Sequence, residues 1–342
     1  MKYLFPLVAV IVLARIAWVG STIPGMQYVF GVDVPYAALI LFIGGFCWRV
    51  IYWAKSPVPF KIPTTCGQGQ SLSWVKRDKL EAPMNNTEVA ARMFLEVVFF
   101  RSLWRNTKAS IQPGPALTYT ATRWLWLFGI LFHYSMLVIV LRHLRLFLDP
   151  VPFPITCIEL IDSVRFAAGP GLAYYITDLL ILVGLVALLL RRVLLRPVRY
   201  ISLANDYFPL FLLLGIVISG ISMRYYLHDG VDIVAIKRLA LGLVTFQPEI
   251  TANIAPIFYT HIFLVSCLLA YFPFSKLMHL GGVFLSPTRN MANDSRIKRH
   301  INPWNPDIKP HSYEGYEDEF REDMVEQGIP VDKELPEKTD KG

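Results

Sequence analysis

Residues 124–147 read WLWLFGILFHYSMLVIVLRHLRLF, and residues 257–280 read IFYTHIFLVSCLLAYFPFSKLMHL. Each stretch is long and apolar enough to cross a hydrocarbon core of about 30 Å, which takes about 20 residues of helix. The first carries His133 and His143, and the second carries His261 and His279. The chain has only 7 histidines among 342 residues, so four of them in two apolar stretches indicate a specific task.

The whole chain has the composition of a protein that crosses a membrane several times. Its mean hydropathy is +0.43, with 54% hydrophobic and 17% charged residues. The net charge of +7 lies in loops beside apolar stretches, where Lys and Arg set topology rather than bind nucleic acid. The 4 cysteines show no metal or haem-attachment spacing, so any redox cofactor here must be held by histidine. We predict an all-α integral membrane protein with six transmembrane helices, at 3–22, 35–53, 124–147, 173–194, 208–227 and 257–280.

The distribution of Lys and Arg predicts the orientation in the membrane. The 55–123 segment and the 191–199 connection are basic, whereas the 23–34 loop has no Lys or Arg. Basic loops stay in the cytoplasm, so we expect both termini on the cytoplasmic side of the cytoplasmic (inner) membrane. Alternatively, the first apolar run is a secretory signal peptide, which would leave five spans in the same orientation. The predicted parts are two N-terminal transmembrane helices at 1–54, a cytoplasmic segment at 55–122, a four-helix transmembrane bundle at 123–280 and a cytoplasmic extended tail at 281–342.

Two parts outside the spans have their own patterns. Residues 87–108 read TEVAARMFLEVVFFRSLWRNTK and predict an amphipathic helix capped by Thr87. This helix lies either along the membrane surface or on the protein's own loops. The tail is polar and acidic from Glu314 to Asp340, so we expect it to order against a partner.

Opposite helix directions pair the four histidines. The third and sixth spans run in opposite senses, which places His143 opposite His261 (the outer pair) and His133 opposite His279 (the inner pair). Along the helix axis, the two histidines are about 15 Å apart in the third span and about 27 Å apart in the sixth. With straight helices both pairs could not lie at matching depths, because the two separations differ by about 12 Å. Pro273 is expected to break the sixth helix and so to reduce this difference in depth. Because two imidazoles fill both axial positions of a haem iron, the pairs predict two bis-histidine b-type haems.

Charged residues in the spans are the next candidates. Haem propionates need cations, and we expect Arg142, Arg15 and Arg224 near the outer haem and Lys276 near the inner one. The alternative for the arginines is that they extend to the membrane surface. Asp178 and His228 are tentative candidates for an outer quinone pocket.

The two histidine spacings, ten and eighteen residues, resemble the cytochrome b subunits of respiratory nitrate reductases, the NarI-like gamma subunit family. The resemblance covers about residues 35–282 and implies a helix bundle in which four histidines hold two b-type haems. The stretch SKLMHLGGVFLSPTRNMANDSRIKRHINPWNP at 275–306, with SLWRNTK at 102–108, resembles the DsrM family of dihaem membrane subunits. That family belongs to a complex associated with dissimilatory sulfite reduction.

The resemblance implies electron exchange between menaquinol or menaquinone and a cytoplasmic iron–sulfur subunit similar to DsrK. Subunits similar to DsrJ, DsrO and DsrP would accompany it, and DsrC would be reached indirectly. Alternatives that keep the two haems are a nitrate reductase gamma subunit and a heterodisulfide reductase cytochrome b. Alternatives without redox chemistry are a proton-conducting transporter, which would use intramembrane histidines as relays, and a passive membrane anchor.

Overall fold

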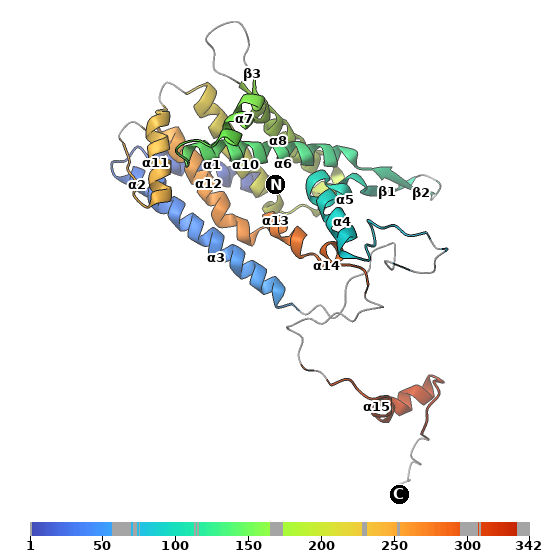
Figure 1. The fold of residues 1–342 in the computed structure, drawn as a ribbon. Helices are drawn as coiled ribbons and strands as arrows, with labels where there is room; N and C mark the ends of the chain where they lie inside the picture. Colours follow the sequence, from blue (N-terminus) through green and yellow to red (C-terminus); the bar gives the residue numbers. More distant parts are fainter. Residues whose placement is uncertain are drawn as a thin grey trace.

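Helices make up most of the residues that the structure describes (Figure 1). The structure, a computed structural model, describes residues 2–56, 70, 74, 76–112, 114, 116–164, 174–227, 231–251, 254–294, 307 and 309–333. The long helices are α1 (Leu4–Gly20), α3 (Val34–Ala54), α6 (Arg123–His143), α8 (Ile176–Leu194), α10 (Ala204–Tyr225) and α12 (Pro256–Tyr271). Helices that are apolar on most sides are typical of membrane spans.

Within the described residues, 4 segments are long and apolar enough to cross a membrane: Met26–Ala54, Arg123–Leu146, Ala204–Tyr225 and Pro256–Phe274. The first combines α2 (Met26–Tyr28), a π-helical turn η1 (Val29–Asp33) and α3. The other two predicted spans also form helices. Of these, α1 is apolar but has 17 residues, and α8 has 19 residues but includes Asp178, Arg191 and Arg192.

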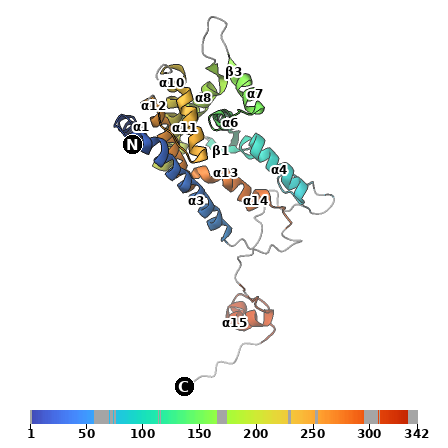
Figure 2. The ribbon, with the colours of Figure 1, turned by 60° about the vertical axis from the view of Figure 1, so that its left-hand side comes forward.

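The long helices pack in a chain of neighbours around the space between α6 and α12. α6 packs against α8, α8 against α10, and α10 against α12, while α1 contacts both α10 and α12. α3 runs along α12 (Figure 2). Gly184 lets α8 approach α6 closely, because a Cβ at this position would lie 3.1 Å from the backbone nitrogen of Phe132. Leu185 and Leu213 fill the core between α8 and α10.

The last span breaks at its proline. After α12 come the 3₁₀ turns η4 (Phe272–Phe274) and η5 (Lys276–Met278) and one helical turn, α13 (His279–Gly282). Ser275 has extended backbone, with φ −118° and ψ 176°, so the chain changes direction there. The predicted interruption near Pro273 is confirmed, but the prediction of one helix reaching residue 280 is wrong, because the helix ends at Tyr271.

The predicted 87–108 helix is also shorter in the structure. α4 spans Asn86–Phe99, and Asn85 rather than Thr87 caps it, because its side-chain oxygen accepts the Glu88 N–H at 2.9 Å. Phe100 has a φ of 51°, which ends the helix. A second short helix, α5 (Arg101–Trp104), follows.

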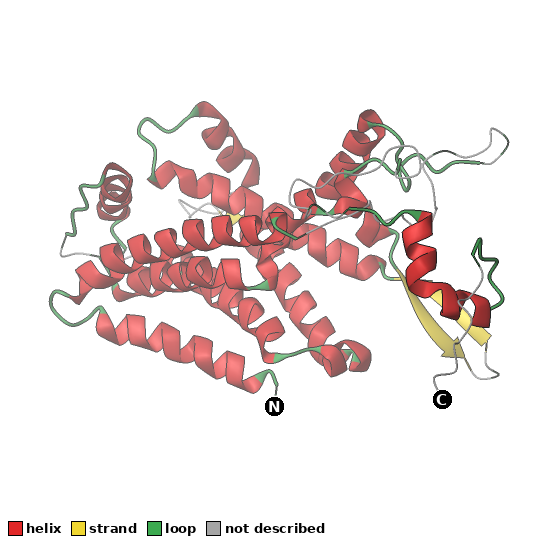
Figure 3. Cartoon of the chain, turned by 90° about the horizontal axis from the view of Figure 1, so that it is seen from below, coloured by secondary structure: helices red, strands yellow, loops and turns green. Residues whose placement is uncertain are grey.

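A β-hairpin contradicts the prediction of an all-α chain. β1 (Thr107–Gln112) pairs antiparallel with β2 (Ala116–Ala121), and Figure 3 draws the two strands in yellow. Gly114 has a φ of 90° between the two strands, a conformation that suits glycine. A shorter antiparallel pair joins β3 (Ser163–Val164) and β4 (Tyr174–Tyr175). The bundle is helical as predicted, and these connections are not.

The remaining elements are connections and the tail. They are η2 (Leu144–Leu146), α7 (Phe153–Asp162), α9 (Arg196–Ile201), α11 (Ile233–Thr245), η6 (Val283–Leu285), α14 (Pro287–Asn290) and α15 (Tyr313–Glu326). In the tail, the buried Glu317 carboxylate of α15 accepts the N–H groups of Asp332 at 2.9 Å and Lys333 at 2.8 Å. The predicted extended tail therefore contains a helix with its own local contacts.

Candidate functional site

The four histidines meet in the two predicted pairs. The ring centroids of His143 and His261 are 6.4 Å apart, with an angle of 13° between the rings. Those of His133 and His279 are 5.9 Å apart, with an angle of 81°. Three of the rings, all except His261, belong to exposed residues although they lie in or beside apolar segments.

These separations fit one metal ion between each pair of rings. An imidazole nitrogen binds a first-row metal at about 2.0–2.1 Å, and the ring centroid lies about 1.1 Å behind that nitrogen, so two imidazoles across one metal have centroids about 6.3 Å apart. Both observed separations lie within about 0.5 Å of that value. Within the described residues, no three His, Cys, Asp or Glu side chains converge as a metal site. The donor sets therefore fit the two axial positions of a haem iron.

On α6 the helix itself orients both imidazoles. His133 Nδ1 lies 2.7 Å from the Gly129 carbonyl oxygen, and His143 Nδ1 lies 2.7 Å from the Ile139 carbonyl oxygen. A carbonyl can only accept, so each Nδ1 carries the hydrogen and each Nε2 presents its lone pair. Such hydrogen bonds fix the tautomer and ring orientation of histidine ligands.

The partner histidines are oriented in the same way by other groups. His279 Nδ1 lies 2.9 Å from the Lys276 carbonyl oxygen. His261 Nδ1 lies 2.9 Å from Ser219 Oγ on α10, and that hydroxyl donates to the Ile216 carbonyl at 2.9 Å. The serine hydroxyl therefore accepts from the imidazole, and all four histidines have their Nδ1 engaged.

Small residues and the break after α12 bring the rings into place. Gly45 on α3 admits the Pro273 ring, because a Cβ at residue 45 would lie 2.8 Å from the proline Cβ. The change of direction after Pro273 turns residue 279 back toward α6, which closes the predicted difference in depth. Gly220 lies beside His261, where a Cβ would be 3.3 Å from the imidazole Cε1.

Two phenylalanines contact the His133 ring edge-on. The centroid of Phe132 lies 4.9 Å and that of Phe100 lies 5.1 Å from the imidazole centroid. Phe100 is the left-handed residue between α4 and α5. A segment outside the long helices therefore contributes directly to the surroundings of a candidate ligand.

Arg142 lies in a buried ionic network next to His143 in the sequence. Its guanidinium lies 3.2 Å from the Asp162 carboxylate and 2.7 Å from the Asp178 carboxylate, and it stacks on Tyr175 at 3.6 Å. The Tyr225 hydroxyl donates to Asp178 at 2.8 Å. The predicted residues Arg142 and Asp178 are therefore brought together, but as partners of each other.

The other predicted site residues are placed differently. Arg224 lies over the Tyr175 ring at 4.1 Å, on the same aromatic residue as Arg142. Arg15 is exposed on α1, away from the buried side of that helix. Lys276 forms an ion pair of 2.5 Å with the buried carboxylate of Asp206. His228 lies outside the described residues.

A cavity of about 700 Å³ lies beside His279. It is lined by cationic and aromatic side chains, and none of its described lining residues is acidic; they include Arg49, Trp53, Tyr271, Lys276 and Arg289. Its volume falls within the range of about 300–1,000 Å³ that ligand sites occupy. This composition suits an anionic group.

Sequence reasoning missed Ser219 and Asp162 as structural partners of the site. Ser219 contacts His261 across 42 residues of sequence, and Asp162 reaches Arg142 through the end of α7. No local pattern marks such contacts between helices. The Arg49 side chain, which was not among the candidates from sequence, lines the cavity beside His279.

Comparison with known proteins identifies the family of the chain. Residues 93–299 match the family described as nitrate reductase gamma subunit, a range that contains all four histidines. The chain is 48% identical over 285 residues to the "Hdr-like menaquinol oxidoreductase cytochrome b-like subunit" of Archaeoglobus fulgidus, covering 81% of this chain and 84% of that protein. It is 45% identical over 280 residues to a protein of the same description from Archaeoglobus profundus, covering 80% and 82%. The chain belongs to the nitrate reductase gamma subunit family.

Proposed function

We propose that this chain is the dihaem cytochrome b-type subunit of a membrane oxidoreductase complex. It exchanges electrons between menaquinol or menaquinone and a cytoplasmic iron–sulfur partner. The observation that carries the proposal is the geometry of the two histidine pairs. Both centroid separations fit one metal ion, and every Nδ1 is hydrogen-bonded, which leaves the Nε2 lone pair available to ligate.

Each pair has a defined task in this proposal. His143 and His261 hold the outer haem b, and His133 and His279 hold the inner haem b. A haem with imidazole at both axial positions supplies one-electron transfer and leaves no metal position open for substrate. The Ser219 hydroxyl and the carbonyls of α6 keep the imidazoles in the ligating tautomer.

Cations near the pairs would bind the haem propionates. Lys276, as expected from sequence, and Arg49 line the cavity beside His279 and serve the inner haem. Arg142, Arg15 and Arg224 are proposed for the outer haem. Arg142 shares its charge with two carboxylates, so its main effect is to fix the position of the α6 end that carries the outer ligand.

We further propose that α1 and α8 cross the membrane, giving six spans and a multi-pass protein of the cytoplasmic membrane with both termini in the cytoplasm. The charges on α8 are compatible with this. Asp178 near its start is neutralised by Arg142, and Arg191 and Arg192 lie in its last turn, where they reach the cytoplasmic surface.

The quinone site is proposed at the outer pair. Asp178 and His228 are its tentative residues, with Asp178 positioned to exchange a proton through the Tyr225 hydroxyl that donates to it. Both relatives carry menaquinol oxidoreductase in their descriptions, which supports a quinone as the substrate. The sequence resemblance to the DsrM family supports a DsrK-like cytoplasmic partner, DsrJ-, DsrO- and DsrP-like companions, an indirect link to DsrC and a role in sulfur metabolism.

Haem content tests the proposal. The purified protein should contain two haems b per chain in a pyridine haemochrome assay. Changing His143 to alanine should leave one haem, and the His143→Ala, His133→Ala double variant should leave none. His311→Ala is the matched control, because that histidine is an exposed tail residue beside Glu319.

The outcomes separate the alternatives. Two haems retained in the His143→Ala variant would overturn the ligand assignment. A colourless wild-type protein would favour the proton-conducting transporter or the passive anchor. Co-purification with a molybdenum subunit would replace the sulfur-linked partner with a nitrate reductase.

A further inference from the structure

The polar and apolar sides of α4 are reversed relative to a helix that faces water. Glu88, Arg92 and Glu96 follow one another at four-residue spacing and therefore share one side of the helix. Arg92 is 4% exposed and Glu96 is 5% exposed. The opposite side carries Phe94, which is 59% exposed, and Val97, which is 38% exposed.

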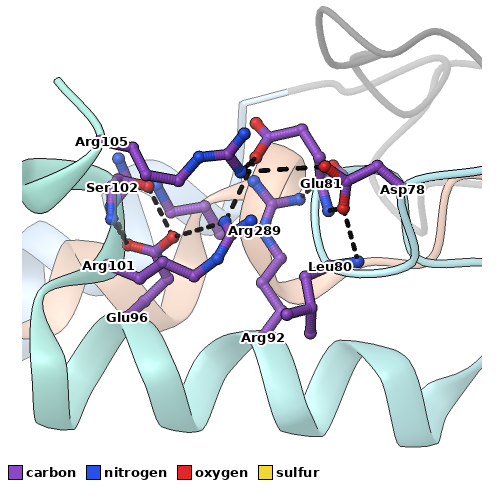
Figure 4. Close-up of polar contacts among 9 residues, drawn as sticks. All are labelled: Asp78, Leu80, Glu81, Arg92, Glu96, Arg101, Ser102, Arg105 and Arg289. Carbon is purple, nitrogen blue, oxygen red and sulfur yellow. Dashed lines mark hydrogen bonds and ion pairs between the residues drawn. The ribbon is translucent and has the colours of Figure 1, made fainter. Parts of the chain in front are cut away.

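The buried charged side chains of α4 pair with groups of the protein, although Arg92 Nε itself has no hydrogen-bond partner. Arg92 donates to the Glu81 carbonyl at 2.9 Å, and Glu96 accepts the Ser102 N–H at 3.0 Å (Figure 4). Arg101 and Arg289 lie 3.8 Å and 3.9 Å from the Glu96 carboxylate. Charged side chains at membrane depth turn inward and pair in this manner.

Four contacts place the segment 86–104, here called the α4–α5 corner, alongside the first turns of the membrane-spanning helix α6. Trp126 donates to the Phe99 carbonyl at 2.8 Å, and Tyr134 donates to the Val98 carbonyl at 2.8 Å. The Phe100 ring contacts His133, and a Cβ on Gly129 would lie 3.4 Å from Leu103 Cδ2. Figure 1 shows α5 beside the N-terminal part of α6, with α4 leading away from it.

The depth of these contacts follows from the helical rise. Trp126 and Tyr134 are three and eleven residues from the first residue of α6, so they lie about 4.5 Å and about 16.5 Å along it. Side chains on a helix lean toward its N-terminus, which brings the tyrosine hydroxyl back toward the membrane surface. The carbonyls of Val98 and Phe99 therefore lie about 5–10 Å inside the span, a depth typical of helices inserted at the membrane interface.

At the C-terminal end of α4, protein side chains donate hydrogen bonds to the last backbone carbonyls, as a helix end in lipid requires. The last carbonyls of a helix have no partner within the helix and are hydrated when they face water. Here the Trp126 indole and the Tyr134 hydroxyl donate to two of them. In hydrocarbon such groups must be satisfied by protein.

We propose that the α4–α5 corner is inserted into the membrane leaflet at the His133 end of the bundle, where its apolar side contacts lipid acyl chains. The exposed apolar residues of that side are Ala90, Ala91, Phe94, Val97 and Phe99. α6, which the corner contacts, also exposes apolar side chains, with Leu137 54% and Val140 51% exposed. The proposal rests on α6 spanning a membrane, not on haem binding.

Photolabelling tests this contact. The full-length protein is reconstituted in phosphatidylcholine and phosphatidylglycerol vesicles that contain a diazirine on an acyl chain, and labelled residues are mapped by mass spectrometry. We expect Phe94 and Val97 to be labelled as strongly as Leu137. Leu117 and Tyr119 of the hairpin are matched controls, because they are equally apolar and exposed at 55% and 66%, and they should be labelled several-fold less.

Three outcomes decide the proposal. Labelling of Phe94 no stronger than that of Leu117 would overturn it. Loss of the Phe94 label in the assembled complex would also overturn it, because a protein partner would then occupy this side. Retained labelling of Phe94 in a His133→Ala variant that binds less haem supports the proposal. It would also show that insertion of the α4–α5 corner does not depend on haem binding.

Discussion

Removing the charge of Arg142 should destabilise the protein by about 3–5 kcal/mol, the usual cost of leaving a buried charge without its partner. The side chains of Arg142 and Asp162 are 8% and 4% exposed, and Asp178 is 16% exposed. In an Arg142→Met variant both carboxylates would lose their cation. They would keep the hydrogen bonds from Thr177 and Tyr225, so a value near the lower end is expected.

The free energy of unfolding can be measured by titrating the detergent-solubilised protein with sodium dodecyl sulfate. Arg145→Met is the matched control, because Arg145 also pairs with a carboxylate, that of Glu159 at 2.9 Å, but is 49% exposed. Its loss should cost no more than about 1 kcal/mol. A triple variant, Arg142→Met with Asp162→Asn and Asp178→Asn, should recover most of the stability, because no buried charge is left alone. Equal costs for Arg142→Met and Arg145→Met would refute the reasoning.

Three further predictions follow from single contacts. A Ser219→Ala variant removes the acceptor of His261 Nδ1 and should weaken binding of one haem by about 10–100-fold in an absorbance titration. A Gly45→Ala variant forces a Cβ to within 2.8 Å of Pro273 and should cost about 1–3 kcal/mol in the same unfolding titration. In the tail, backbone N–H groups of residues 332 and 333, with Arg321, lower the pKa of the Glu317 carboxyl group. The ionised Glu317 carboxylate therefore stabilises the folded tail fully above the ordinary glutamate pKa of about 4.3. This stabilisation is lost as the pH falls through the lowered pKa. Hydrogen exchange of those amides, corrected for intrinsic rates, should accelerate in that range, and a Glu317→Gln variant should lack this pH dependence.

The parts of the site that the sequence predicts are those set by helical repeat and span direction. The positions of His133 and His143 on one helix, and the reversal of the last span, suffice to predict which rings meet. The break at Pro273 is predictable because proline cannot continue the hydrogen-bond ladder of a helix. Its extent is not, because the extended backbone at Ser275 leaves no mark in the local sequence.

The connections are harder to predict for two different reasons. Phe100 adopts a positive φ although it is not glycine, so the apolar periodicity through Trp104 wrongly favours a continuous helix. The hairpin had a usable signal, because Pro113, Gly114 and Pro115 form a turn-like break before a segment that contains Thr118, Tyr119 and Thr120, residue types that favour strands. The partners of Arg142 come from other helices and are set only by tertiary packing.

The division of each histidine pair between α6 and the end of the chain has a consequence for biosynthesis. At about 5–20 residues per second, a ribosome takes roughly 7–27 s to move from His143 to His279. During that time α6 holds both of its imidazoles in the ligating tautomer through its own carbonyls, without help from later helices. Neither pair can be completed until the last span has been synthesised. At the proposed haem sites, haem capture would therefore be a late step in maturation, and a nascent chain arrested before residue 261 would carry two prepared half-sites and no complete one.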